Sequence, residues 1–158
     1  MSLIEDLASL FDRDLTRLIQ QLEAFPSEDQ LWMEVPGIAN TAGNLMLHLE
    51  GNLREFIGRQ LGGVEYLRRH PLEFSARNLP RTELAERLAG VRTLVGDALR
   101  KLETEELGAI YPEQPFGKPI STWQFLISLH GHLTYHTGQI DCLRRVQAGG
   151  GAVDYVEL

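Results

Sequence analysis

The chain has 158 residues, of which 43% are hydrophobic and 23% are charged, a composition that argues against a disordered or fibrous protein. Its formal net charge is −7 and it has no basic stripe, so we expect no nucleic-acid partner, because binding to nucleic acid requires neutralised phosphates. No apolar run approaches the roughly 20 residues that cross a bilayer, so we expect no membrane association either.

The first two elements in chain order are predicted to be long amphipathic helices. The first covers about residues 2–25, because Ser2 and Glu5 form a capping-box pair ahead of apolar residues at helical spacing. The second covers about residues 40–60, opening at Asn40-Thr41, and it stops at a pair of glycines. One stripe of this second helix carries a histidine among its inward-facing members, which are Leu45, His48, Leu49, Asn52 and Phe56.

Two more helices are predicted after a mixed segment at residues 64–80. The third covers about residues 81–106, where leucines and valines recur in steps of three and four. Residues 111–119 hold three prolines and a glycine, which predicts a loop or short hairpin. The fourth helix covers about residues 121–148 and ends at a glycine triplet. Together these elements predict an all-α fold, an antiparallel four-helix bundle forming one domain over residues 1–158.

Three of the five histidines fall on the apolar faces of these helices. At about 100° per residue, His132 and His136 lie about 40° apart and about 6 Å apart along the axis, so both rings can reach one point. His48 faces inward from the second helix. Because neighbouring helices of a bundle lie about 8–10 Å apart, three facing imidazoles can hold a divalent ion with an open coordination position. The alternative is that each histidine is a hydrogen-bonded core residue.

The remaining histidines and the single cysteine are expected outside this cluster. His70 is expected in an exposed loop, and His130 on the far side of the fourth helix, at the surface or in an interface. Cys142 flanks the histidine face and is expected to be a buried structural thiol. A single cysteine excludes an internal disulfide, and the acidic start of the chain lacks the layout of a secretory signal, so we expect a cytoplasmic protein.

Helix geometry places no carboxylate beside the three histidines. Glu50 and Asp141 point away from them, and only the loops at residues 64–80 and 107–119 could deliver Glu73 or Glu113. This favours activation of an incoming thiol over a carboxylate-assisted hydrolase. Polar residues next to the expected ion are candidates for supporting its ligands, with a helix-surface position as the alternative; they are Asn44, Asn52 and Gln139.

Two segments also resemble a known family. Residues 132–140, HLTYHTGQI, resemble the His-x-x-x-His-x-Gly-Gln-Ile signature of the DinB-like superfamily of metal-binding four-helix bundles. Residues 40–49 are similar to the second-helix segment of that family, which ends in a histidine followed by an apolar residue. Residues 68–74 resemble an element of one subgroup. The resemblance covers nearly the whole chain.

The resemblance implies a divalent metal, zinc or nickel above all, held by His48, His132 and His136. It also implies a metal-dependent enzyme, since the family includes thiol transferases and isomerases that use low-molecular-weight thiols such as bacillithiol or mycothiol, and it implies a homodimer. We therefore expect an enzyme that acts on a small-molecule substrate, foremost a transferase with such a thiol as co-substrate. The alternatives are a small metallohydrolase and a non-catalytic bundle that binds metal or a partner protein.

Overall fold

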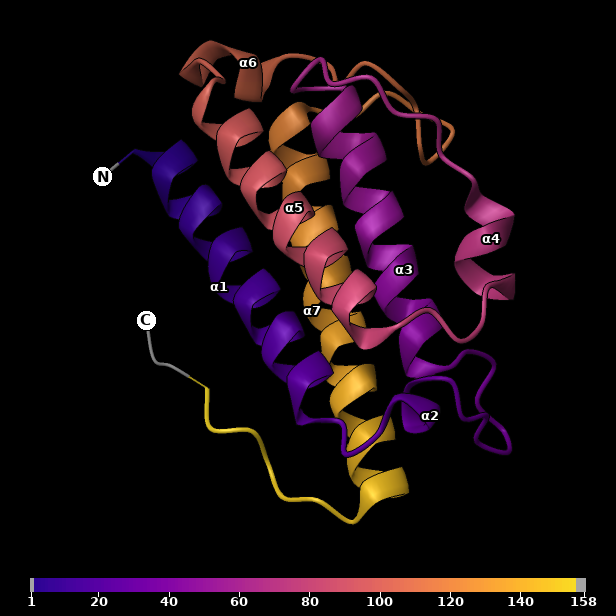
Figure 1. The fold of residues 1–158 in the computed structure, drawn as a ribbon. Helices are drawn as coiled ribbons and strands as arrows, with labels where there is room; N and C mark the ends of the chain where they lie inside the picture. The colour runs from indigo at the N-terminus through magenta and orange to yellow at the C-terminus, as the bar shows by residue number, and fades with distance from the viewer. Residues whose placement is uncertain (1, 156–158) are drawn as a thin grey trace.

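The computed structural model describes residues 2–155, and within that range the chain is helical and contains no strand (Figure 1). The long helices are α1 (Leu3–Ala24), α3 (Ala42–Leu53), α5 (Arg81–Arg100) and α7 (Thr122–Ala148). The short ones are α2 (Glu28–Leu31), α4 (His70–Ser75) and α6 (Thr104–Gly108). None of the helices in the described range has the length and hydropathy that a membrane crossing requires.

Side-chain caps set the starts of three long helices. The hydroxyl of Ser2 accepts a hydrogen bond from the backbone at the start of α1 at 3.2 Å, and Thr41 and Ser121 do the same for α3 and α7. Gly149 ends α7 with a φ of 63°, which a residue without a β-carbon adopts freely. The four predicted long helices are therefore confirmed, within a few residues at most ends.

The second predicted helix changes its winding near its end. After Leu53 the chain continues as a π-helical segment, η1 (Arg54–Arg59), in which the backbone N–H groups reach one residue further back. The carbonyl of Phe56 there accepts a hydrogen bond from the hydroxyl of Tyr111 at 2.7 Å. Burial, with the charges of nearby carboxylates, raises the pKa of this tyrosine.

The third predicted helix is shorter than expected. It ends at Arg100 rather than near residue 106, because Glu103 and Glu106 form a capping box that starts the separate helix α6. The segment before α7 is a loop with one isolated bridge between Ile110 and Ser121, and not a hairpin of strands. The mixed segment at residues 64–80 contains α4, which the sequence pattern did not predict.

The apolar stripes of the long helices meet in one core. α1 packs against α5 and α7, and α3 packs against the same two helices from the other side. The largest fully buried side chains include Phe11, Leu15, Leu49, Ile57 and Leu84. The short helix α4 packs on the outer side of α3 (Figure 1). The candidate residues His48 of α3 and His132 and His136 of α7 therefore lie on helices that pack against each other, next to α4.

Candidate metal centre

The three inward histidines meet between α3 and α7. His48 Nε2 lies 3.0 Å from His132 Nε2, and the His136 ring centroid lies 4.4 Å from that of His132 and 5.3 Å from that of His48. One ring nitrogen from each histidine lies within 4.8 Å of the other two. The spacing argument from the sequence therefore predicted this convergence correctly.

The surroundings keep two of the rings neutral. Burial lowers the pKa of His132 to about 4, and the neighbouring His136 and His48 act in the same direction. Burial also lowers the pKa of His136, although its hydrogen bond with Gln139 opposes this. At neutral pH these imidazoles carry a free lone pair, which is the form that binds metal ions.

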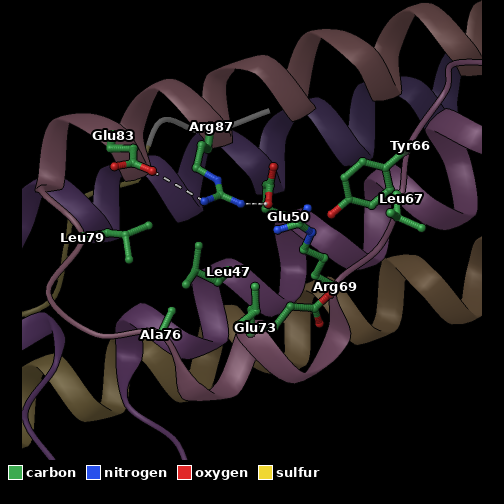
Figure 2. A pocket seen from close by; sticks show the side chains of 11 residues that line it. Leu47, Glu50, Tyr66, Leu67, Arg69, Glu73, Ala76, Leu79, Glu83 and Arg87 are labelled. Atoms are coloured by element: carbon green, nitrogen blue, oxygen red, sulfur yellow. Dashed lines mark hydrogen bonds and ion pairs between the residues drawn. The ribbon is translucent and has the colours of Figure 1, made fainter.

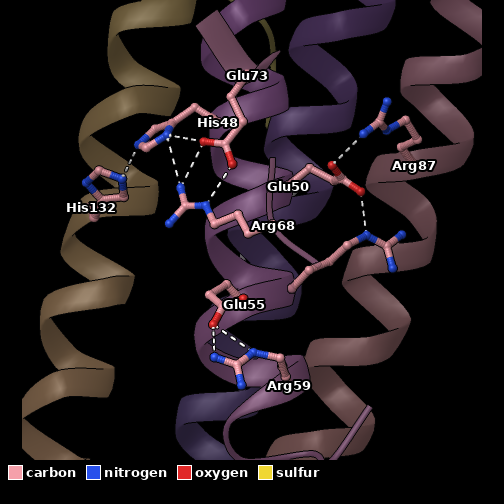
Figure 3. Close-up of polar contacts among 9 residues, drawn as sticks. His48, Glu50, Glu55, Arg59, Arg68, Glu73, Arg87 and His132 are labelled. Carbon is pink, nitrogen blue, oxygen red and sulfur yellow. Dashed lines mark hydrogen bonds and ion pairs between the residues drawn. The ribbon is translucent and has the colours of Figure 1, made fainter. Parts of the chain in front are cut away.

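A carboxylate from α4 orients the third ring. Glu73 Oε2 lies 2.9 Å from His48 Nδ1, and Arg68 donates to both oxygens of the same carboxylate, at 2.7 and 2.8 Å (Figure 3). Burial raises the pKa of Glu73, but the hydrogen bonds from His48 and Arg68 outweigh it, so the pKa lies below its ordinary value. An ionised Glu73 holds the proton of His48 on Nδ1, so that Nε2 presents its lone pair to the other two histidines.

Two residues of α3 give Glu73 its position. A β-carbon on Gly51 would overlap Oε1 of Glu73, so the carboxylate reaches His48 only because this position has no side chain. Asn44 Nδ2 donates to the backbone carbonyls of Glu73 and Ala76, at 2.9 and 3.0 Å. Asn44 therefore fixes the helix that carries the carboxylate and forms no hydrogen bond with the described histidines.

The other two polar candidates differ from each other. Gln139 Oε1 lies 2.6 Å from His136 Nδ1, so it orients that ring as Glu73 orients His48. Its Nε2 donates to the hydroxyl of Tyr135 at 3.1 Å. Asn52 is buried, but among the described residues it forms no hydrogen bond with the histidines, and its Oδ1 has no protein partner.

A second group of potential ligands surrounds His48. His70 is exposed, as predicted, but it opens α4, and its ring centroid lies 6.0 Å from that of His48. With Glu73 these residues also place one potential ligand atom each within 4.8 Å. The guanidinium of Arg68 already occupies the carboxylate, so a cation in this group would face a positive charge. The cluster of three histidines is the better cation site.

Two other carboxylates, Glu50 and Glu113, stay away from the cluster of three histidines. Glu50 lies on the opposite side of α3 and pairs with Arg54 and with Arg87, the latter at 3.1 Å (Figure 3). Arg87 lines a pocket of about 470 Å³ among α3, α4 and α5, where it also pairs with Glu83 (Figure 2). Glu113 accepts a hydrogen bond from Arg59 at 3.0 Å and does not reach the cluster.

Two predictions about α7 can be compared with the structure. His130 points away from the cluster, as predicted, and it lies half-buried in the interface with α1, against Phe11 and with Nε2 2.9 Å from Asp14 Oδ2. Cys142 is exposed, so the prediction of a buried thiol was wrong. Its flank of α7 borders an open groove instead of packing under another helix.

Comparison with known proteins finds a matching family model and solved structures with a similar fold. A family model described as the DinB superfamily matches residues 5–140. No curated protein matches the sequence. Among solved structures, a conserved protein from Enterococcus faecalis is similar with a TM-score of 0.75 and 20% identity, over 95% of this chain and 99% of that one. A DinB-like protein from Bacillus cereus is similar with a TM-score of 0.70 and 21% identity, over 94% and 97% of the two chains. At these identities the likeness to solved structures shows the fold alone.

Proposed function

The chain belongs to the DinB superfamily, and from this premise we propose that it is a metal-dependent enzyme whose divalent ion is held by His48, His132 and His136. The observation that carries the proposal is the convergence of one nitrogen from each ring between α3 and α7. Three neutral nitrogen ligands suit zinc or nickel and leave a coordination position for a reactant.

The donor set fits such an ion. A direct hydrogen bond between two of the ring nitrogens leaves the third without a partner inside the cluster, whereas an ion uses one lone pair from each ring. The far nitrogens of His48 and His136 already have partners in Glu73 and Gln139. Such partners are the usual support of metal-binding histidines, since they fix the tautomer and the orientation of the ring.

Among the possible reactions, thiol transfer is the best supported. A dication with three neutral ligands keeps its full charge, and it can hold a thiol as the thiolate or acidify a water molecule. A hydrolase would also need a base, and Glu73 is the carboxylate in contact with the cluster. Its oxygens are occupied by Arg68 and His48 and its pKa is lowered, so it is a poor proton acceptor near neutral pH. We infer a transferase that joins a low-molecular-weight thiol to a small-molecule substrate.

The cellular location, the oligomeric state and the domain organisation are part of the same proposal. We infer a cytoplasmic homodimer, each chain being one antiparallel four-helix domain over residues 1–158. A small metallohydrolase is the second candidate, favoured only if a base reaches the cluster from elsewhere. A non-catalytic bundle that binds metal or a partner protein is the third.

Elemental analysis of the purified protein tests the metal site. We expect about one zinc or nickel ion per chain, lost in His132→Ala and His136→Ala. His70→Ala is the matched control, because it removes a neighbouring histidine outside the proposed ligand set and should keep the ion. Equal metal content in wild type and His136→Ala would refute the site.

Incubation with a thiol and an electrophile tests the reaction. We expect conjugation by the metal-loaded protein and none above background when all three histidines are replaced by alanine. Hydrolysis of test esters without conjugation would favour the metallohydrolase. Conjugation that survives loss of the three histidines would contradict metal-assisted transfer.

A further inference from the structure

An apolar groove of about 540 Å³ lies along the flank of α7 beside the histidine cluster. Its walls are the segment at residues 35–40, the outer face of α7 at residues 135–146, and Leu45 at the start of α3. None of the described residues that line it is charged. The large side chains exposed there include Ile38, Tyr135 and Val146, which are 51%, 63% and 73% exposed. Such a concentration of exposed apolar surface marks a binding site.

The groove lies next to His136, one member of the cluster of three histidines. Two of its lining residues contact His136: the Tyr135 ring centroid lies 5.2 Å from the imidazole centroid, and Gln139 Oε1 lies 2.6 Å from Nδ1. On the helix, Gln139 is one turn beyond His136 and Val146 almost three turns beyond it. A molecule in the groove would therefore have one end beside His136 and the other near the end of α7.

We propose that this groove binds an uncharged, mainly apolar small molecule, the substrate whose reacting end meets the histidine cluster. Its role as a substrate site rests on the proposed function, whereas occupation of the groove does not. The volume falls in the range of small-molecule sites, about 300–1,000 Å³, and such sites combine apolar walls with a few polar groups. Those groups here are Asn40, Gln139 and the hydroxyl of Tyr135. A charged ligand would lose hydration without gaining a partner.

The shape of the groove favours a small molecule over a second copy of the chain. A dimer interface buries about 800 Å² on each partner, over broadly complementary surfaces. This site is instead a hollow between a loop segment and one helix, and two of its polar side chains, Tyr135 and Gln139, lie next to His136. Polar side chains beside His136 and otherwise apolar walls match a ligand that is held in one orientation.

Two natural features make the groove testable. Cys142 is the single cysteine of the chain, it is exposed and it lines the groove, so its alkylation rate reports occupation. Gly138 also lines the groove, and a β-carbon there meets no atom within 4 Å, so Gly138→Leu fills the groove without a clash at its base. Gly131→Leu is the matched control, because this glycine lies on the same helix with equally open space but outside the groove.

The experiment titrates the full chain with N-phenyl-1-naphthylamine, an uncharged apolar fluorophore. We expect saturable binding of about one probe per chain, with alkylation of Cys142 by iodoacetamide slowed at least tenfold at saturation. Gly138→Leu should weaken binding at least tenfold and Gly131→Leu less than twofold. The anionic 8-anilinonaphthalene-1-sulfonate should bind at least tenfold more weakly than the neutral probe.

Three results would overturn the groove as a ligand site. These are absence of binding, binding that Gly138→Leu leaves unchanged, and equal binding of the two probes. A fourth is protection of Cys142 without probe in a dimer that Gly138→Leu splits into monomers, which would assign the groove to a second copy of the chain.

Repeating the titration on chelator-treated protein and on His132→Ala separates the two proposals. Probe binding should persist without the ion. Binding in a protein that never holds metal would refute the proposed function and keep the groove. A full complement of metal without probe binding would refute the groove and keep the metal site.

Discussion

Gly51 lets a carboxylate from a neighbouring helix reach His48. Its missing side chain leaves the space that Oε1 of Glu73 occupies, while Oε2 contacts the imidazole and Arg68 holds both oxygens. The two oxygens thus have different neighbours, and only one of them depends on the glycine. A substitution at Gly51 can therefore disturb the orientation of His48 while leaving the histidine itself unchanged.

We predict that Gly51→Ala weakens zinc binding by roughly 10–100-fold, the usual effect of losing the partner of a metal-binding histidine. The clash falls on the far end of a flexible side chain, so Glu73 should move rather than the helix. Stability of the ion-free protein should not rise, because the gain of up to about 1 kcal/mol from alanine in a helix is offset when Glu73 leaves its buried pair with Arg68. Competition titration with a zinc chelator measures the affinity.

Gly131→Ala is the control for this prediction. It makes the same change in α7 where a β-carbon meets no atom within 4 Å, and it should leave the zinc affinity unchanged. Equal affinities for wild type and Gly51→Ala would mean that Glu73 does not depend on this space.

At the scale of elements, α1 and α7 are joined by a buried charge. Asp14 of α1 is 2% exposed and lies within 3.1 Å of Arg13, Arg17 and His130, the last of which belongs to α7. Burial raises the pKa of Asp14, but hydrogen bonds with His130 and Arg13 outweigh it and hold the pKa well below its ordinary range. The carboxyl group therefore takes up a proton more readily in the unfolded chain, where its pKa is about 3.9.

The sign of this difference predicts acid sensitivity. The stabilisation from Asp14 is fully present above about pH 4 and is lost as the pH falls below the pKa of the unfolded chain. We predict that Asp14→Asn lowers the free energy of unfolding by about 2 kcal/mol at pH 7, less than for a fully buried pair because its partners are partly exposed. Urea denaturation at pH 7 and pH 3.5 should show a smaller acid loss in the variant than in wild type.

Asp12→Asn is the matched control, because Asp12 lies two residues away and pairs with Arg92 at a half-exposed position. It should cost about 0.5 kcal/mol at pH 7, as exposed ion pairs do. If Asp14→Asn and Asp12→Asn gave equal losses, the buried link between α1 and α7 would not stabilise the fold.

At the scale of the whole molecule, the sequence predicted the features that depend on local helical periodicity. It missed features that depend on contacts between distant segments. Helical spacing is fixed by the backbone, so the positions of the long helices and the inward direction of His48, His132 and His136 followed from the residues. The position of Glu73 did not, because residues 64–80 lack a period and α4 docks through its contact with Asn44. Cys142 was misplaced for a similar reason: a flank of a helix is buried only if another segment covers it.

Removal of the proposed ion tests the molecule as a whole. An ion bound only by the folded chain adds about 4 kcal/mol to its stability when the free ion is at 1,000 times its dissociation constant. We predict that chelation lowers the melting temperature of the loaded wild type, and that His136→Ala melts at the same temperature with and without chelator. An equal melting temperature of the wild type with and without chelator would contradict the prediction that a bound ion stabilises the fold.

The separation of the cluster's residues along the chain limits when an ion can bind during folding. His48 and His132 are 84 residues apart, whereas His132 and His136 share one turn of α7. Closing a loop of that length costs several kcal/mol of chain entropy, which a collapsing chain recovers only after α3 has docked on α7. The nascent helix alone offers two of the three imidazoles, so capture of the proposed ion would belong to the last steps of folding and would not template the earlier ones.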